Sequence, residues 1–363
     1  MNTSDLRKTP LNSRHKEIGA KMTEFGGWEM PVSYEGIISE HKYVRDVAGV
    51  FDISHMGEFL LEGEDVKTLL QTLMVNDLRL LEPSKGQYSC ICYENGTVVD
   101  DCIYYEENPT TYRMIVNASN REKDFKWINS HIDNLEVTIK DLTSERSRLA
   151  FQGPKTDELL NPLTDIDVSD INRFYFRKCK LDGISIFIAR TGYTGEKGFE
   201  LSASKDNIED IFNKLLDTEA KPIGLGARDS LRLEACYSLY GHEISDKITP
   251  IEANIGWVVK QKDDIDYIGK NILLKQKNEG TSRIIVGLTL KDPGIMRQNY
   301  KVFVDGKEIG YLTSGGYSPT LEKSIGLALI QSEYNELEKE VDIQIRKKMK
   351  KAEVVSTPFY QNV

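Results

Sequence analysis

The sequence lacks the residue patterns that usually build a metal site, a disulfide framework or a membrane span. Five cysteines and five histidines are scattered along 363 residues, and they form no C-x-x-C pair and no H-E-x-x-H motif. No zinc site is therefore expected, and the cysteines are predicted to be buried thiols. No apolar run is long enough to cross a bilayer, and the N-terminal MNTSDLRKTP has no apolar core like that of a secretory signal. We expect a cytoplasmic, metal-free chain with no membrane partner.

Positive charge is also scarce. The chain has 47 Lys and Arg against 57 Asp and Glu, a formal net charge of −10. This balance argues against nucleic acid or an anionic membrane as the main partner. The one basic run, RKKMKK at Arg346–Lys351, has no interleaved aromatic residues and lies in a β pattern. Such a run is more typical of a charged turn or edge strand than of a nucleic-acid site.

What the sequence does contain is a series of strand-like segments interrupted by short helices. The length suits two or three domains. From about residue 51 to 141 the pattern is rich in strands, with a helix predicted near Asp124–Ile132 from its apolar stripe. Farther on, a strand is predicted over Gly183–Ala189 and a helix near Asn207–Leu216.

The C-terminal part is predicted to be mainly strands. It begins at Arg283 and contains Asp305-Gly306, a strong hairpin dipeptide. The preceding tract Gln261–Ser282 is rich in Lys, Asp, Asn and Gly and indicates the approach to a boundary. We therefore expect a region over 1–278, with a second interleaved lobe at roughly 51–140, and a β domain over 279–363.

The stretch VVDDCIYY places two carboxylates, Asp100 and Asp101, side by side in a strand, where Asp is disfavoured. Asn95-Gly96 just before it predicts a two-residue hairpin turn in which Glu94 pairs with Thr97. In this register Asp101 faces Cys90 and shares its side of the strands with Cys92, Tyr88, Ile103 and Tyr105. Asp100 shares the opposite side with Ser89, Ile91 and Tyr104.

Both sides of this hairpin carry apolar and aromatic residues, so a carboxylate on either side needs a donor, a cation or a ligand. One interpretation is structural: one aspartate bonds a backbone amide and the other reaches solvent. The other interpretation is that one aspartate lines a ligand cavity. The alternation of the strand alone leaves open which aspartate that is.

Two glycine-containing motifs do not match the nucleotide-binding fingerprints. RTGYTGEKGFEL (Arg190–Leu201) offers Tyr193 and Glu200 to an aromatic, amide-like heterocycle, with a structural hairpin as the alternative. GLGARDSLRLEACYSLYG (Gly224–Gly241) lacks the third glycine of a dinucleotide site, and Asp229 or Ser230 is predicted to cap a helix there. Arg228 at that entrance is placed to bind an anion or to form a structural salt bridge. His55 in FDISHMGEF is interpreted as a packed core histidine.

These segments together resemble one family, the aminomethyltransferase (T-protein) of the glycine cleavage system. The resemblance covers nearly the whole chain. It is carried by GAKMTEFGGWEMPVSY, FDISHMGEF, NGTVVDDCIYY, VNASNREKDFKWI, FQGPK, RTGYTGEKGFEL, GLGARDSLRLEACYSLYG and TSGGYSPTLEKSIGLAL, in this order. Departures are small: Asn12-Ser13 stands where an aromatic-acidic pair is common, and Thr97 replaces a usual glycine.

The resemblance implies a multidomain α+β fold. It would have mainly antiparallel sheets flanked by helices around a central folate channel, and a C-terminal all-β domain of jelly-roll or barrel-like form. It also implies a tetrahydrofolate-dependent enzyme that takes a methylene from the aminomethyl-lipoyl group of the H-protein and releases ammonia. Asp101 corresponds to the essential aspartate of the family. Folate-lining positions correspond to Met56, Tyr88, Ile103, Tyr105, Asn117, Tyr193, Glu200, Arg228, Tyr237, Trp257 and Arg297.

The implied chemistry needs a carboxylate near folate N10 that orients this weak nucleophile and takes up its proton. An alternative is a folate-binding protein of the same fold that assists iron–sulfur maintenance without methylene transfer. That family carries a reactive cysteine in a K-G-C-aromatic-x-G-Q-E signature, whereas the nearest text here, YSLYGHEIS, has no cysteine at the corresponding place. Flavin-dependent relatives need a G-x-G-x-x-G strand-helix unit, which the sequence does not show.

Overall fold

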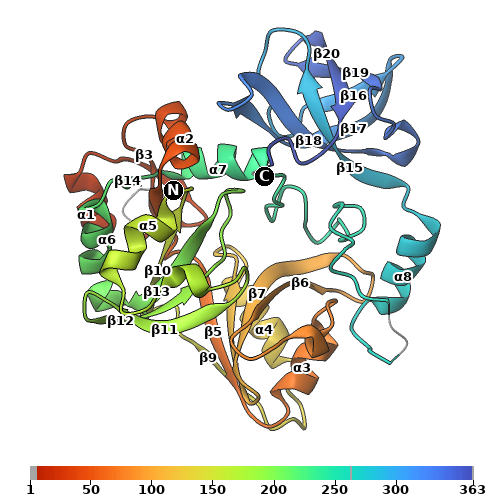
Figure 1. Cartoon of the computed structure of the whole chain (residues 1–363). Helices are drawn as coiled ribbons and strands as arrows, with labels where there is room; N and C mark the ends of the chain where they lie inside the picture. The colour runs from red at the N-terminus through yellow and green to blue at the C-terminus, as the bar shows by residue number, and fades with distance from the viewer. Residues whose placement is uncertain (1–5, 262–263, 362–363) are drawn as a thin grey trace. The chain divides into compact units, whose positions relative to one another are not determined.

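The computed structural model describes residues 6–261 and 264–361. The chain forms two compact units, each assembled from segments that are separate in the sequence. The first contains Met1–Leu69, Arg79–Gln87 and Cys102–Asp229, and the second contains Leu70–Leu78, Tyr88–Asp101 and Ser230–Val363. The course of the chain can be followed by colour in Figure 1.

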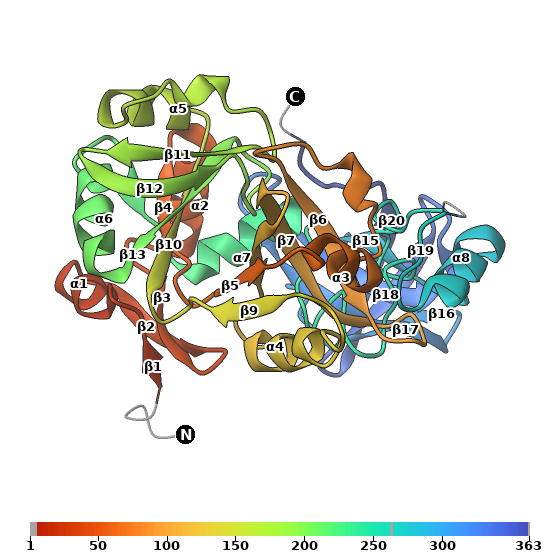
Figure 2. The ribbon, with the colours of Figure 1, turned by 90° about the horizontal axis from the view of Figure 1, so that it is seen from below.

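A six-stranded sheet forms the main core of the first unit, with strand order β11-β12-β13-β10-β4-β14. Its strands are β4 (Gly49–Asp52), β10 (Arg146–Gln152), β11 (Phe176–Leu181), β12 (Ile184–Ala189), β13 (Gly198–Ser204) and β14 (Lys221–Pro222). The helices α5 (Thr156–Leu160) and α6 (Ile208–Leu216) contact these strands (Figure 2). Phe151, Phe199 and Phe212 are fully buried in this core. Because α6 buries Ile208, Ile211, Phe212 and Leu215, its predicted apolar stripe is confirmed.

A small three-stranded sheet with the order β1-β3-β2 lies in the N-terminal part of the first unit. Its strands are β1 (Arg7–Lys8), β2 (Lys21–Phe25) and β3 (Trp28–Ser33), accompanied by α1 (Asn12–Glu17) and α2 (Ile37–Asp46). Short 3-10 helices occur at Leu78–Leu80, Asn161–Leu163, Val168–Asp170, Lys205–Asn207 and Ser332–Tyr334.

A five-stranded sheet with the order β6-β7-β8-β5-β9 carries the aspartate pair. Its strands are β5 (Gly57–Glu62), β6 (Gly86–Cys92), β7 (Val98–Asn108), β8 (Thr111–Val116) and β9 (Thr138–Asp141). The helices of this part of the chain are α3 (Val66–Leu73) and α4 (Arg121–Asn129). The helix expected near Asp124–Ile132 therefore exists as α4, but it begins three residues earlier.

The turn before the aspartate pair differs from the prediction. Tyr93, not Glu94, is opposite Thr97: the Tyr93 N–H donates to Thr97 O at 2.9 Å, and the Gly96 N–H donates to Tyr93 O at 2.9 Å. Gly96 has a positive φ of 81°, whereas Asn95 does not have a positive φ. The Asn95 side chain instead accepts hydrogen bonds from the Thr97 N–H and hydroxyl, at 3.1 and 2.7 Å. The loop is thus a three-residue turn that ends in a left-handed glycine, and the two-residue turn was wrong.

The helix α7 (Leu225–Glu234) begins before the predicted cap. Asp229 and Ser230 lie inside it, so neither is its N-cap, and Arg228 lies in its first turn. The start of α7 is held by a residue far away in the sequence: the N–H of Gly224, directly before the helix, donates to Glu40 Oε2 at 2.8 Å. A long-range contact of this kind leaves no local sequence signature.

The C-terminal strands close into a barrel with the order β15-β18-β17-β16-β19-β20 (Figure 1). They are β15 (Arg283–Leu290), β16 (Lys301–Val304), β17 (Lys307–Ser318), β18 (Lys323–Gln331), β19 (Glu340–Ile345) and β20 (Lys348–Val355). Asp305 and Gly306 both have positive φ, 50° and 79°, and Val304 pairs with Lys307, so the predicted two-residue hairpin is confirmed. The tract before the barrel contains α8 (Lys270–Glu279), and residues 262–263 of that tract lie outside the described residues.

The expected α+β class with mainly antiparallel sheets is confirmed, and the C-terminal β domain is barrel-like. The basic run at Arg346–Lys351 forms the turn between β19 and β20 and the start of β20, where Lys351 pairs with Glu340 and Asp342. Four of the five cysteines are buried free thiols, as predicted, and Cys236 is half-buried.

Candidate active site

In the second unit, a carboxylate lies beside an aromatic stack. Tyr88 on β6 donates its hydroxyl to Asp101 Oδ2 on β7 at 2.9 Å. The Tyr88 ring stacks on Trp257, with ring centroids 5.8 Å apart and an interplanar angle of 28°. Trp257 is 58% exposed, so this stack offers a flat apolar surface close to an anionic group.

The two neighbouring aspartates differ in exposure. Asp100 is 0% exposed, whereas Asp101 is half-buried. The predicted two-residue turn would have put Asp101 and Tyr88 on the same side of the hairpin; the turn is different, yet the hydrogen bond between the two residues is observed. Of the two carboxylates, Asp101 is the one that a ligand can reach.

In the first unit, Glu200 on β13 is held among polar side chains. It is 8% exposed, and its Oε2 accepts a hydrogen bond from the Thr191 hydroxyl at 2.9 Å. The Thr191 hydroxyl also lies 3.3 Å from the Tyr105 hydroxyl. Burial raises the pKa of Tyr105 strongly, and the nearby Glu200 carboxylate raises it further, so this phenol stays protonated.

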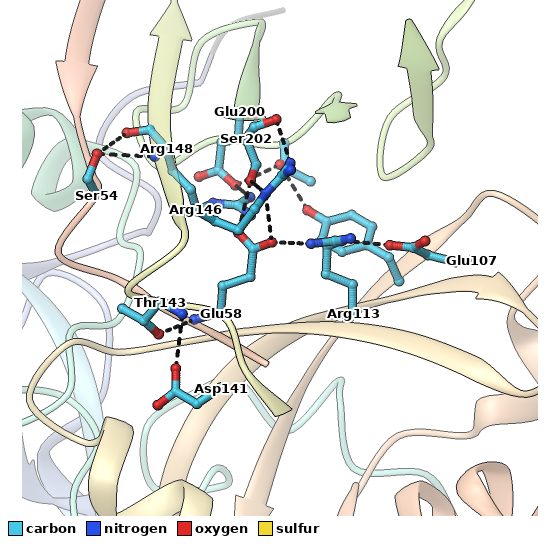
Figure 3. A network of polar contacts seen from close by, with 12 residues as sticks. Ser54, Glu58, Glu107, Arg113, Asp141, Thr143, Arg146, Arg148, Glu200 and Ser202 are labelled. Atoms are coloured by element: carbon cyan, nitrogen blue, oxygen red, sulfur yellow. Dashed lines mark hydrogen bonds and ion pairs between the residues drawn. The ribbon is translucent and has the colours of Figure 1, made fainter. Parts of the chain in front are cut away.

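Behind Glu200 lies a buried chain of charges that the sequence analysis missed (Figure 3). Arg148 Nη2 is 3.7 Å from Glu200 Oε2, and Arg148 Nη1 donates to Glu58 Oε2 at 3.1 Å. Glu58 also bonds Arg113 and accepts from the Ser202 hydroxyl at 2.9 Å. Arg146 and Arg148 lie two residues apart in the strand-like RSRLAFQ, and this charged alternation in an apolar strand is the signal that was available.

Arg228 forms a second cationic feature of the first unit. Its guanidinium lies 4.6 Å from the centroid of the Tyr193 ring, so two of the predicted residues contact each other. His55 is 2% exposed, and its Nδ1 has no hydrogen-bond partner among the described residues. Burial, followed by the charge of Arg228, lowers the pKa of His55 to about 4, so its ring is neutral at physiological pH. The interpretation of His55 as a packed histidine agrees with this burial.

The other predicted residues fall into an apolar group and a dispersed group. Met56 and Ile103 pack against a cluster formed by Tyr105, Ile115, Phe176, Phe187 and Ala189. Asn117 directly follows β8 and is half-buried. Tyr237 lies three residues after the end of α7, and Arg297 lies exposed before β16 and donates to Gly315 O at 3.4 Å. Asn117 belongs to the first unit, and Tyr237 and Arg297 belong to the second.

Each unit offers its own groups to a ligand. In the first unit Glu200 is a buried acceptor and Tyr193 is an aromatic face; in the second the Tyr88–Trp257 stack is an aromatic face and Asp101 is an accessible carboxylate. In the described part of the chain, no group of three or more His, Cys, Asp or Glu side chains is arranged to hold a metal ion. Within the same residues, no helix combines the length and the apolar character needed to span a membrane.

Comparison with known proteins assigns the chain to a class. Residues 11–263 match the family model described as the GCVT N-terminal domain, and residues 283–361 match the glycine cleavage T-protein C-terminal barrel domain. The fold and these two matches define an enzyme with the T-protein architecture.

Full-length relatives give the particular family. Aminomethyltransferases of Geobacillus sp. (strain WCH70) and Listeria innocua are 46% and 47% identical to the chain, over 98% and 99% of it and 99% of each relative. The crystal structure of the glycine cleavage system aminomethyltransferase T from Bartonella henselae matches with a TM-score of 0.93 at 31% identity, over 98% of both chains. The chain belongs to the glycine cleavage T-protein family, and it is an enzyme of the aminomethyltransferase class. The iron–sulfur alternative is not favoured by these relatives.

Proposed function

We propose that the chain transfers the methylene of an aminomethyl group, carried on the lipoyl arm of an H-protein, to tetrahydrofolate, with release of ammonia. Membership in the T-protein family supports this reaction, this co-substrate and this partner. We further propose that the enzyme works in the cytoplasm. The division into a folate-binding region over 1–278 and a β domain over 279–363 remains part of this proposal.

The observation that carries the proposal is the Asp101 carboxylate held by the Tyr88 hydroxyl at 2.9 Å. Tetrahydrofolate supplies two nitrogen nucleophiles, N5 and N10. A fixed carboxylate near N10 orients this nitrogen, accepts its proton and stabilises the positive charge that develops on the transferred carbon. The Tyr88 hydroxyl binds one oxygen of Asp101 and so holds the carboxylate in one orientation. The other oxygen is then available to the ligand.

The other predicted residues supply binding. Glu200 would accept hydrogen bonds from the amino and ring N–H groups of the pterin, because it is a buried carboxylate already aligned by Thr191. Arg228, stacked on Tyr193, would bind a ligand acceptor. Apolar and aromatic contacts would come from Met56, Tyr88, Ile103, Tyr105, Tyr237 and Trp257, and further polar contacts from Asn117 and Arg297.

The reaction can be tested directly with purified enzyme, aminomethylated lipoyl H-protein and tetrahydrofolate. We expect formation of 5,10-methylenetetrahydrofolate and ammonia in equal amounts, with the lipoyl group left in its dithiol form. Omission of tetrahydrofolate should lower the rate strongly. An enzyme that binds tetrahydrofolate tightly but forms no methylene product from the loaded carrier would contradict the proposed reaction.

The binding role of Glu200 leads to a quantitative expectation. Glu200→Gln should weaken tetrahydrofolate binding by about 1.5–3 kcal/mol, because an amide presents a donor to ligand N–H groups that need an acceptor. Arg228→Ala should also raise the tetrahydrofolate Kd while leaving the apparent affinity for the carrier nearly unchanged. Isothermal titration calorimetry measures the first effect, and carrier-dependent kinetics measure the second.

Glu209→Gln is a suitable control, because Glu209 is exposed on α6 and makes the same chemical change away from the candidate residues. Its tetrahydrofolate affinity should equal that of the wild type. If Glu200→Gln and Arg228→Ala also bind tetrahydrofolate like the wild type, both residues have been assigned wrongly.

A further inference from the structure

An open cavity of about 530 Å³ lies in the first unit, and none of its lining residues is among those assigned above to the substrate, although Phe187 of its wall contacts Tyr105. It is lined by Arg113, Arg146, Asp165, Lys178, Cys179, Lys180, Ser185, Ile186 and Phe187. Its size falls within the range of small-molecule sites, which is roughly 300–1,000 Å³. We propose that this cavity binds a small anion that carries two or more negative charges.

The sheet register explains why cations gather here. On β11 and β12, Lys178 pairs with Phe187 and Lys180 pairs with Ser185, so these four side chains share one face of the sheet. Phe187 is opposite Ser202 on β13, and Ser202 is opposite Arg148 on β10. Arg146 and Arg148 therefore belong to the same face. One side of a four-strand segment thus carries two lysines and two arginines.

Carboxylates from β5 and β7 of the five-stranded sheet compensate some of these cations. Glu58 binds Arg148 at 3.1 Å and also pairs with Arg113 (Figure 3). Glu107 binds Arg113 Nε at 2.6 Å and Lys178 Nζ at 2.5 Å. These pairs account for Arg113, Arg148 and Lys178, whereas Arg146 has only a longer contact with Glu58, at 3.7 Å, and Lys180 has no ion pair within the described residues.

Arg146 is the under-compensated guanidinium at the cavity. Its nearest carboxylate atom is Glu58 Oε1 at 3.7 Å, and its hydrogen bonds go to the hydroxyl and carbonyl of Ser202. Its Nη1 has no hydrogen-bond acceptor among the described residues. Burial lowers the pKa of Arg146, Glu58 opposes this, and the positive charges of Arg113 and Arg148 lower it further. An anion beside Arg146 would relieve this repulsion.

Lys180 adds a second positive charge. Within the described residues its ammonium forms no ion pair, and Asp165, the one carboxylate in the cavity lining, accepts from the Lys180 backbone N–H at 2.7 Å. The lining therefore carries four cationic side chains against one carboxylate, on a chain whose formal charge is −10. A concave positive region on an acidic protein concentrates anions locally.

The exposed part of the lining narrows the class of ligand. Phe187 and Ile186 belong to the wall but are only 2% and 3% exposed, and the Arg113 guanidinium lies 5.1 Å from the centroid of the Phe187 ring. A ligand therefore meets mainly the polar groups of the lining, and its charged groups reach Arg146 and Lys180. Aromatic or short-chain dicarboxylates and organic phosphates share this chemistry.

Titration calorimetry at constant ionic strength tests the proposal with three probes: phthalate, phenyl phosphate and inorganic phosphate. We expect saturable one-site binding of phthalate or of phenyl phosphate to the wild type, and the stronger of the two identifies a carboxylate or a phosphate ligand. Inorganic phosphate, which carries the charge without an organic part, should bind through the same cations. Binding should persist with saturating tetrahydrofolate, because no lining residue of the cavity is among those proposed to contact tetrahydrofolate.

Two variants remove the cations. Lys180→Gln changes an exposed residue and should weaken binding by about tenfold, the effect of one lost charge-assisted hydrogen bond. Arg146→Gln should weaken it at least as much, but it also removes bonds to Ser202, so its folding must be checked by circular dichroism. Arg177→Gln is the matched control, because Arg177 is an exposed neighbour on β11 whose side chain points to the other face. It should bind like the wild type.

Three outcomes would overturn the proposal. The first is no saturable binding of either organic probe to the wild type. The second is equal binding by the wild type and Lys180→Gln. The third is competition between the bound probe and tetrahydrofolate, which would assign the cavity to the substrate. None of these outcomes bears on aminomethyl transfer, which is measured separately with the loaded carrier.

Discussion

Asp101→Asn is expected to lower the rate of methylene transfer by about 10²–10⁴-fold, the usual effect of removing a positioned acid–base group. The substitution keeps the size and shape of the side chain. The amide oxygen of Asn can still accept from the Tyr88 hydroxyl, which now lies 2.9 Å from Asp101 Oδ2. What is lost is the negative charge and the ability to take up a proton. Tetrahydrofolate affinity should therefore change little, and the loss should appear in kcat.

Asp100→Asn provides the comparison, because it is the same chemical change one residue away. Asp100 is 0% exposed, so its substitution is expected to act on folding and to leave most of the activity per folded molecule. Both variants should be purified, their secondary structure compared with the wild type, and single-turnover rates measured with loaded H-protein. Equal losses in the two variants, or a larger loss in Asp100→Asn, would show that the wrong aspartate has been chosen.

The hairpins at Asn95-Gly96 and Asp305-Gly306 show how far a turn dipeptide predicts the conformation of a loop. Asp305-Gly306 and Asn95-Gly96 are both strong two-residue turn sequences, and both sit between strands. At Asp305 the aspartate adopts the left-handed conformation, with φ 50°, and the prediction holds. At Asn95 the side chain bonds Thr97 instead, and the loop takes in Glu94. The outcome depends on a local competition for the Asn95 amide, which the dipeptide rule does not include.

Long-range contacts account for the other differences. The apolar stripe of α6 is local, so its position was predicted within one residue. The start of α7 depends on Glu40, which is far away in the sequence, and the local cap at Asp229 or Ser230 was therefore misleading. The contact between Tyr88 and Asp101 was predicted from a hairpin register that the observed turn does not have, and the stacking of Trp257 on Tyr88 joins residues that no pairing rule connects.

The buried network was beyond prediction for the same reason. Its members come from four different strands: Glu58 from β5, Arg113 from β8, Arg148 from β10 and Glu200 from β13. Each alone is a charged residue in a strand, which local patterns interpret as a solvent-facing position. Only the folded sheets bring opposite charges together and make their burial acceptable.

That burial gives the second large expected effect, in the stability of the first unit. Glu58 is 1% exposed and is shared by the guanidinium groups of Arg148, Arg113 and Arg146. Burial alone would raise the pKa of Glu58, but these three positive charges and the Ser202 hydroxyl hold it below its ordinary value. Glu58→Gln leaves the buried cations without their common partner. It should destabilise the unit by about 3–5 kcal/mol at pH 7.

The pH dependence gives a check on the cause. Because the pKa of Glu58 is lower in the folded chain than in the unfolded chain, its stabilising contribution is present above the unfolded value of about 4.3 and is lost as the pH falls through the folded value. The difference in stability between the wild type and Glu58→Gln should therefore shrink below about pH 4. A packing defect would persist over the whole pH range.

Glu62→Gln on the same strand is the matched control. Glu62 pairs with Lys140 at 3.2 Å, but the two side chains are 39% and 63% exposed, so this pair should contribute less than about 1 kcal/mol. Urea unfolding followed by hydrogen exchange at amides of β5 and β10 measures the stability of the first unit without assuming that both units unfold together. Equal, small losses for Glu58→Gln and Glu62→Gln would mean that Arg113, Arg146 and Arg148 are compensated without Glu58. A large loss confined to Glu58→Gln and to pH values above about 4 would identify this carboxylate as the anion that keeps the buried Arg113 and Arg148 and the partly exposed Arg146 in the fold.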